Sequence, residues 1–296
     1  MSLTSTLETL AHYRAHNTRA SKDIVEKGHV VLKGSGLRKL GDDSWQFLEQ
    51  YALAAIDVGD FDSADDALQR LTDQFPGSPR VDVLVGIRME ATEPNDTVLK
   101  YYDELMTEDP ANAAVWKRRI SMKRRLGRVE QAVQDLSEYL DTFYNDVEGW
   151  LELADIYSAC NQYTQSLQSL SHVLLLAPQN PFYMLRFAET AYTANDLQLA
   201  LKTALVVIDM AERDVTSSTE TPATGISIRA WWCIKLCSRK LLAQPNLSSA
   251  SGTTAPKSLR LIDELATERM MTTYSVTDKQ IAQGRDEVVG WMSATP

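Results

Sequence analysis

The sequence predicts an all-α protein built as a superhelical solenoid of helix-turn-helix repeats. The first observation is a period of 34 residues, which separates Pro76 from Pro110 and Trp116 from Trp150, while Pro178 follows Pro110 by two periods. The second is composition, since 44% of the residues are hydrophobic but no apolar run approaches the roughly 18 residues of a membrane span. A solenoid grows lengthwise by adding repeats, so we expect one continuous array.

Small side chains recur at two positions of the period and support the register. With repeats at 45–78, 79–112, 113–146, 147–180 and 181–214, the eighth position reads Ala52, Gly86, Ile120, Ala154 and Ala188, and the twentieth reads Ala64, Val98, Ala132, Ser166 and Ala200. Helices that cross closely need short side chains at the contact. The pattern resembles the tetratricopeptide repeat, and the fourth repeat matches its marked positions most fully, with Trp150, Leu153, Ala154, Tyr157, Leu170 and Pro178.

Both ends depart from the repeat, and we expect helical caps there. Residues 1–40 form the predicted N-terminal cap, with helices at Thr4–Ala15 and Ser21–Lys33, and the five repeats fill 41–214. A polar loop at 215–225 then leads to C-terminal helices in 226–296, one of them at Leu259–Thr273. Ser275 and Asp278 resemble a capping box that opens the last helix. The Ser- and Thr-rich segment 244–256 is predicted to be disordered.

Charge is segregated along the chain. The net charge is −10, which argues against non-specific nucleic-acid binding. Residues 41–112 contain 17 acids and four bases, a balance of 4 − 17 = −13, and the next segment, WKRRISMKRRLGR, contains seven bases and no acid. In the repeat register, Lys117, Arg124 and Arg125 fall at positions that line the concave groove of this repeat family. Two interpretations stay open: a solvated helix face, or a surface that contacts an acidic or carbonyl-rich partner segment.

Two bases of this segment occupy positions that normally hold core residues. Arg119 and Lys123 replace Leu- and Tyr-like side chains, so they must reach solvent or meet acids, and Glu148 and Asp155 are candidate mates. A tryptophan pair near the C-terminus is more typical of a core than of a surface anchor for another subunit. The candidate partner-binding residues are therefore Lys117, Arg118, Arg119, Arg124, Arg125, Trp231 and Trp232.

Motifs of catalysis are absent from the sequence. There is no phosphate-binding loop, no H-E-x-x-H and no G-x-S-x-G, so we predict a protein that is not an enzyme. His12 and His16 have helical spacing, but no local residue completes a metal site, and we expect no metal or cofactor. The three cysteines, Cys160, Cys233 and Cys237, lack paired spacing and are predicted to be buried and reduced. The N-terminus shows no secretory signal pattern.

Four segments give a more specific resemblance. LGDDSW (40–45), QFPGSPRV (74–81), GIRMEA (86–91) and DPANAAVWKR (109–118) resemble, in order and spacing, the family of subunit 2 of the endoplasmic reticulum membrane protein complex, over roughly residues 20–215. The resemblance implies a non-catalytic scaffold on the cytosolic face of the endoplasmic reticulum membrane. It would have no membrane span and would grip cytosolic parts of membrane subunits that insert tail-anchored and multi-spanning proteins.

A soluble co-chaperone or adaptor that binds peptide tails is the alternative function. Such repeat proteins grip a terminal carboxylate with Lys and Asn four residues apart on a first helix. In this chain no Lys is followed by Asn at that spacing, and the corresponding pairs include Glu49 with Leu53 and Lys117 with Ser121. The sequence therefore favours the scaffold.

Overall fold

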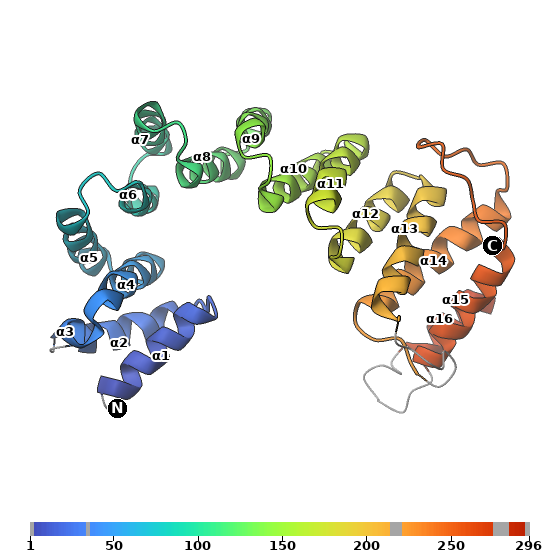
Figure 1. Ribbon diagram of the computed structural model, residues 1–296, viewed down its shortest axis with the longest axis horizontal. Helices are drawn as coiled ribbons and strands as arrows, with labels where there is room; N and C mark the ends of the chain where they lie inside the picture. Colours follow the sequence, from blue (N-terminus) through green and yellow to red (C-terminus); the bar gives the residue numbers. More distant parts are fainter. Residues whose placement is uncertain (1–2, 34–35, 214–220, 275–283, 294–296) are drawn as a thin grey trace. The chain divides into compact units, whose positions relative to one another are not determined.

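The computed structural model describes residues 3–33, 36–213, 221–274 and 284–293, and every element in these ranges is a helix (Figure 1). The helices of the first unit are α1 (Leu3–Ala15), α2 (Ser21–Lys33), α3 (Gly36–Leu40), the short 3-10 turn η1 (Gly41–Asp43), α4 (Ser44–Val58), α5 (Phe61–Gln74), α6 (Pro79–Thr92), α7 (Asn95–Glu108) and α8 (Ala113–Arg125). Those of the second are α10 (Val147–Ala159), α11 (Tyr163–Leu176), α12 (Pro181–Thr193), α13 (Leu197–Ala211), α14 (Ile226–Ala243), α15 (Leu259–Thr273) and α16 (Arg285–Ser293). The all-α repeat fold is confirmed.

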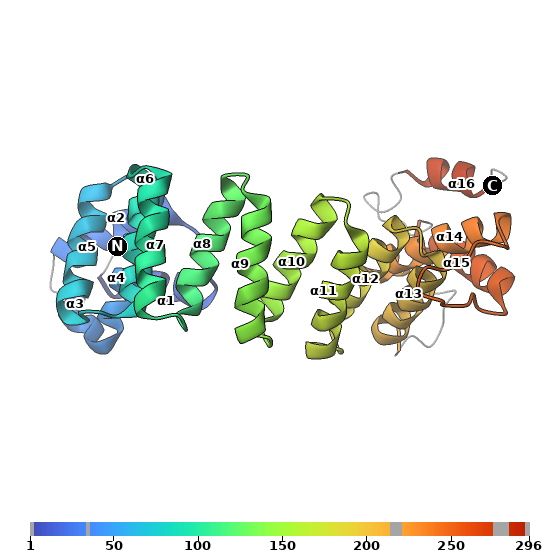
Figure 2. The ribbon, with the colours of Figure 1, turned by 90° about the horizontal axis from the view of Figure 1, so that it is seen from above.

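The chain divides into two compact units where the sequence predicted one continuous array. The first ends at Tyr139 and the second begins at Leu140, so that α9 (Val129–Thr142) spans the division. Within each repeat the two helices pack side by side, as α6 with α7 and α10 with α11 (Figure 2). Among the described residues, none of the helices combines the length and hydrophobicity needed to span a membrane.

Short side chains lie where the two helices of a repeat cross. The small residues at the eighth and twentieth positions are fully buried: Ala52, Ala64, Ala132, Ala154, Ala188 and Ala200 each have 0% exposed surface. Ser166 is equally buried but polar. Its hydroxyl donates a hydrogen bond to the carbonyl of Ala154 at 2.9 Å. Its polar group is therefore satisfied inside the helix contact.

Gly86 lies at a close approach between the two helices of the second repeat. A Cβ at this position would lie 2.4 Å from Cε1 of Tyr102 and 2.6 Å from its hydroxyl oxygen. The Tyr102 ring has no room to retreat, because it is 0% exposed and its hydroxyl donates to Glu90 Oε1 at 2.7 Å. The distance between α6 and α7 therefore requires glycine here.

The turn between the two helices of a repeat adopts one conformation in four of the five repeats. Its fifteenth position has a positive φ at Gly59 (81°), Gly127 (72°), Asn161 (58°) and Asn195 (62°). Glycine and asparagine are the residues that adopt this left-handed conformation at least cost, and it ends the first helix. The second repeat instead turns through the Glu93–Pro94 pair, both in extended conformations.

The tryptophans that reveal the period have a structural role. Trp116 Nε1 donates to the carbonyl of Pro110, and Trp150 Nε1 donates to that of Tyr144, both at 2.9 Å. In each case the acceptor lies six residues upstream, in the loop that precedes the helix. The indole therefore holds the entry loop against the first helix of its repeat.

Arg119 and Lys123 meet acids, as their core positions required. Lys123 Nζ lies 2.6 Å from Asp135 Oδ2, and Arg119 lies 3.4 Å from Asp135 Oδ1 and 3.0 Å from Asp103 Oδ1. The prediction that Asp155 pairs with these two side chains was wrong, because Asp155 forms its ion pair with Arg186. The Asp135 side chain is only 7% exposed, so two cations and one carboxylate share a buried site between α8 and α9.

The C-terminal helices close the second unit around Trp231. Its side chain is 3% exposed, and its Nε1 donates to Glu212 Oε1 at 3.0 Å. Arg269, 1% exposed, lies 3.0 Å from Glu212 Oε2 and donates to the carbonyl of Thr221 at 2.7 Å. These contacts tie α15 to the end of α13 and to the start of the segment that leads into α14.

The segment 244–256, for which the composition predicts disorder, contacts the beginning of α13 in the structure. The carboxylate of Asp196 accepts a hydrogen bond from Ser249 Oγ at 2.7 Å and another from the Ser251 backbone N–H at 2.9 Å. Gln198 donates to the carbonyl of Leu247 at 2.6 Å. Composition could not reveal this, because the acceptor that fixes the loop lies about 50 residues upstream, at the beginning of α13.

The three cysteines differ in their exposure. Cys160 was predicted to be buried but is exposed, because it caps the end of α10 at a turn, whereas Cys233 and Cys237 are buried. The capping box at Ser275 and Asp278, and most of the loop at 215–225, lie outside the described residues.

We predict that Gly86→Ala destabilises the first unit by about 1–3 kcal/mol, the usual cost of overpacking a core. Helix propensity alone would favour alanine by about 1 kcal/mol, so the sign of the change tests the contact with Tyr102. Gly290→Ala is the control, because nothing lies within 4 Å of a Cβ there. Urea unfolding followed by circular dichroism measures both; a Gly86→Ala protein as stable as the parent would contradict the close crossing.

We further predict that Asp135→Asn lowers the unfolding free energy of the first unit by about 3–5 kcal/mol, because it leaves two buried cations without their shared carboxylate. Adding Lys123→Met should recover part of the loss. Glu104→Gln breaks the exposed pair with Lys100 and should cost less than about 0.5 kcal/mol. Thermal and urea denaturation compare the three proteins, and equal effects of the two acid substitutions would rule out a buried ion cluster.

Candidate functional site: a groove in the first unit

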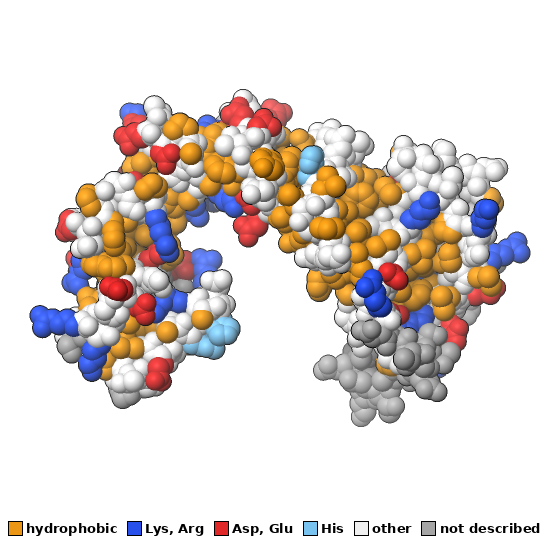
Figure 3. All heavy atoms as spheres, viewed as in Figure 1, with side chains coloured by type: hydrophobic (Ala, Val, Ile, Leu, Met, Phe, Trp, Pro, Cys, Tyr) orange, Lys and Arg blue, Asp and Glu red, His pale blue; other side chains and the backbone are white. Residues whose placement is uncertain are grey.

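The first unit contains a groove of about 710 Å³. It is lined by α1, the start of α2 and the first helices of three successive repeats, α4, α6 and α8. Figure 3 shows Lys and Arg side chains along the hollowed inner side of this unit, beneath α8. Concave surfaces of stacked helical repeats are the usual binding surfaces of such proteins.

The lining side chains of the repeats form a regular stripe. Apart from Ala54, at position ten, they fall at positions two, five, six, nine, twelve and thirteen, which is the spacing of one helix face. The residues at these positions are Gln46, Glu49, Gln50, Leu53, Ile56 and Asp57 of α4, Arg80, Ile87, Glu90 and Ala91 of α6, and Arg118 and Arg125 of α8. The groove therefore combines an apolar centre, at Leu53 and Ile87, with charged side chains on either side of it.

Ion pairs connect neighbouring elements along this surface. Arg80 of α6 binds Glu49 of α4 through two hydrogen bonds, of 3.0 and 2.5 Å. Arg19, just before α2, binds Asp57 of α4 through two more, of 2.8 and 2.5 Å. Planar two-pronged pairs of this kind give geometric specificity as well as energy. In the second unit, Arg229 of α14 binds Glu189 of α12 in the same manner.

Glu90 is the most enclosed acid of the groove, with a side chain that is 7% exposed. Arg118 lies 2.6 Å from its Oε1, Arg125 lies 3.3 Å from its Oε2, and the Tyr102 hydroxyl donates to Oε1. Burial, together with the hydrogen bond to Glu90, raises the pKa of Tyr102. Burial alone would lower the pKa of Arg118, but the hydrogen bond and charge of Glu90 outweigh it and raise that pKa. The carboxylate thus holds two arginines at one wall.

Arg14, in the last turn of α1, is the arginine of the opposite wall. Its Nη1 donates to Gln50 Oε1 at 3.0 Å, and Gln50 Nε2 in turn donates to the carbonyl of Leu10 at 3.3 Å. The Gln50 amide is therefore fixed at both ends and orients the guanidinium. Burial lowers the pKa of Arg14, and the more distant charge of Asp43 partly offsets this effect.

The basic segment of the third repeat is not the unpaired surface that the sequence suggested. Arg118 and Arg125 line the groove but are bound to Glu90, and Arg119 is held by Asp103 and Asp135. Lys117 lies over the ring of Tyr139, 6.0 Å from its centroid, and does not line this groove. Arg124 is exposed and does not line it either. The acids that pair with the segment come from neighbouring helices, which a linear count of charges cannot show.

The tryptophan pair is part of the C-terminal core. Trp231 is too deeply buried to act as the surface anchor considered above. Trp232 is half-buried between Tyr274 and Trp291, whose ring centroids lie 6.4 and 5.7 Å away. The core interpretation therefore holds for both residues within the described part of the chain.

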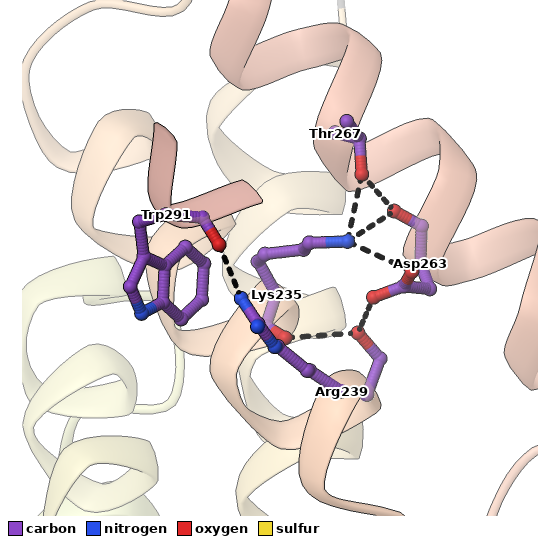
Figure 4. A network of polar contacts seen from close by, with 6 residues as sticks. Lys235, Arg239, Asp263, Thr267 and Trp291 are labelled. Carbon is purple, nitrogen blue, oxygen red and sulfur yellow. Dashed lines mark hydrogen bonds and ion pairs between the residues drawn. The ribbon is translucent and has the colours of Figure 1, made fainter. Parts of the chain in front are cut away.

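A buried lysine, Lys235, lies in the same region within a network of polar contacts (Figure 4). The Lys235 ammonium lies 2.8 Å from Asp263 Oδ2 and 2.8 Å from Thr267 Oγ1, and Ser238 Oγ donates to Asp263 Oδ1 at 2.8 Å. Arg239 next to it donates to the carbonyl of Trp291 at 2.7 Å. Since these donors face protein acceptors, the network joins α14 to α15 and α16.

Sequence reasoning missed several groove residues, including Arg14, Arg19, Arg80 and Glu90. A signal for those in the repeats was present, because the groove positions of the first two repeats follow from the same register that placed Lys117 and Arg125. Applying all six positions to all repeats would have selected Arg80 and Glu90. Arg14 and Arg19 lie outside the repeats, so no register could have located them.

Comparison with known proteins agrees with this architecture. Residues 79–202 match the family model described as the EMC2 TPR-like repeat domain. The chain is 40% identical over 186 residues to ER membrane protein complex subunit 2-A of Xenopus laevis, covering 63% of this chain and 62% of that protein. It is 35% identical over 153 residues to TPR repeat protein oca3 of Schizosaccharomyces pombe, covering 52% and 54%. The chain thus spans less than two thirds of the relatives it matches.

A solved structure supports the fold on its own. The C-terminal part of a TPR repeat-containing protein from Cytophaga hutchinsonii superposes with a TM-score of 0.56 at 13% identity, covering 94% of this chain and 98% of that one. At this identity the likeness concerns the fold alone. The family model over residues 79–202 and the relatives named above support the resemblance drawn from the four sequence segments.

Proposed function

We propose that this protein is a non-catalytic scaffold subunit of the endoplasmic reticulum membrane protein complex. The observation that carries the proposal is the 40% identity to subunit 2-A of that complex over 186 residues. In this role the chain is peripheral, lies on the cytosolic face of the membrane and supports the insertion of tail-anchored and multi-spanning proteins. Its partners are the other subunits of the complex.

The groove of the first unit is the proposed contact for cytosolic segments of the membrane-spanning subunits. It offers apolar side chains at its centre, and Leu53 is 36% exposed there. Apolar anchors supply most of the energy of such contacts, while charged side chains set register and suppress wrong partners. The ion pairs between α4, α6 and α8 hold the side chains of the groove in fixed positions in the absence of a partner. This preorganisation lowers the entropic cost of binding.

We predict that the tagged full chain, recovered from membranes solubilised in a mild detergent, brings several multi-spanning subunits with it. Identification of the co-purified chains by mass spectrometry is the measurement. Recovery of soluble chaperones alone would overturn the scaffold proposal in favour of the co-chaperone.

The contribution of the groove is tested by a matched pair of variants on one helix. Leu53→Lys places a charge at the apolar centre and should reduce recovery of the subunits by about tenfold or more, the effect of losing an interface anchor. Val58→Lys makes the same change at a residue that is similarly exposed, 38% against 36%, but does not line the groove. Equal recovery with both variants would exclude the groove as the contact.

A further inference from the structure

The charges of the groove do not balance. Its lining includes five arginines but three carboxylates, namely Arg14, Arg19, Arg80, Arg118 and Arg125 against Glu49, Asp57 and Glu90. This excess of two positive charges lies inside a unit whose residues 41–112 carry a large excess of acid. The groove therefore differs in sign from the segment of chain that supplies most of its walls.

Each of the three carboxylates is already engaged. Asp57 is bound by both prongs of Arg19, and Glu49 by both prongs of Arg80. Glu90 is shared by two arginines and a tyrosine. The acids of the groove therefore have little capacity left for a further cation, and between them they bind four of its five arginines.

Arg14 is the exception. Within the ranges that the structure describes, it forms no ion pair, and its side-chain hydrogen bond goes to the neutral amide of Gln50. Its residue is half-buried, so the guanidinium has lost part of its water without gaining an ion pair, and the charge of Asp43 only partly offsets this loss. Because Gln50 occupies Nη1, the other donors of the planar fork are directed elsewhere, and such a fork matches the two oxygens of a carboxylate.

The surroundings of Arg14 specify more than charge. Gln50, which orients it, lies one helical turn before Leu53 on α4, and helical neighbours three apart share a face. Leu53 is one of the large apolar residues exposed in this unit, and it lines the same groove. A ligand that satisfies both residues must present a carboxylate beside an apolar side chain.

We propose that the groove binds a protein segment through an acidic side chain that pairs with Arg14, while an apolar side chain next to it contacts Leu53. The inference rests on the proposed function, in which cytosolic segments of other subunits occupy this groove. It adds the chemistry of the segment: an internal Asp or Glu next to an apolar residue. A free terminal carboxylate is the rival source of the same charge, and the test separates the two.

The experiment is selection of random 12-residue peptides displayed through a C-terminal fusion, against the purified full chain. Such peptides have no free terminal carboxylate, so any preference for acids must come from side chains. We expect the wild-type chain to enrich peptides with Asp or Glu at a fixed spacing from an apolar residue. Arg14→Glu should lose this preference and enrich Lys or Arg at the same position.

Selected peptides, made synthetically and labelled, then give affinities by fluorescence anisotropy. Replacing the enriched acid by its amide should weaken binding to the wild type about tenfold or more. The same replacement should leave binding to Arg14→Gln unchanged, because that variant has already lost the ion pair between the peptide and Arg14. Lys39→Glu, an exposed charge reversal outside the groove, should bind the acidic peptide as the wild type does. Circular dichroism melting checks that each variant is folded.

Two results would overturn this inference. Selection without enrichment of acids, or enrichment that survives Arg14→Glu, would show that Arg14 does not receive a carboxylate side chain. Either result leaves the proposed function standing if the tagged wild-type chain still recovers the multi-spanning subunits. If the tagged chain failed to recover the multi-spanning subunits, the complex would no longer be the source of the segment. A preference for acidic peptides that depends on Arg14 would still identify the chemistry that the groove binds.

Discussion

The close crossing of α6 and α7 at Gly86 is the contact on which the groove depends. Because Gly86 lacks a Cβ, the Tyr102 ring can lie against α6, where its hydroxyl reaches Glu90. Glu90 then holds Arg118 and Arg125 of the next repeat on the inner wall. A packing requirement between two helices thus sets the position of charged groups on a third. Similar crossings, each with a fully buried small residue, fix the other repeats.

Charge segregation along the chain serves mainly to join the repeats. The acids of α4, α6 and α7 and the bases of α8 look like opposing surfaces in the sequence, but many of them are partners in the folded unit. Exposed pairs of this kind contribute at most about 1 kcal/mol each, whereas the enclosed pairs at Glu90 and Asp135 are costly to break. The enclosed pairs therefore specify how successive repeats stack, and the exposed ones add little.

Few charged groups of the groove remain without an internal ion pair, and these few indicate what a partner must supply. A surface with seven bases in thirteen residues suggested broad attraction to acidic partners. The folded groove instead pairs four of its five arginines with acids and leaves Arg14, from the N-terminal cap, without an ion pair in the described structure. Specificity in such a groove comes from a small number of unsatisfied groups, because groups that are already paired gain little from a new partner.

The sequence by itself determined the repeat, its register and the helical ends, because these depend on local patterns: small residues at crossings, and proline and tryptophan at the turns. It also required that Arg119 and Lys123 meet acids. Only the tertiary structure decided which acids these were, that Trp231 is enclosed, that Asp196 fixes the segment 244–256, and that Arg14 faces the groove. The physical reason is distance along the chain, since these contacts join residues 12 to 55 positions apart, and a linear pattern does not encode which helices meet.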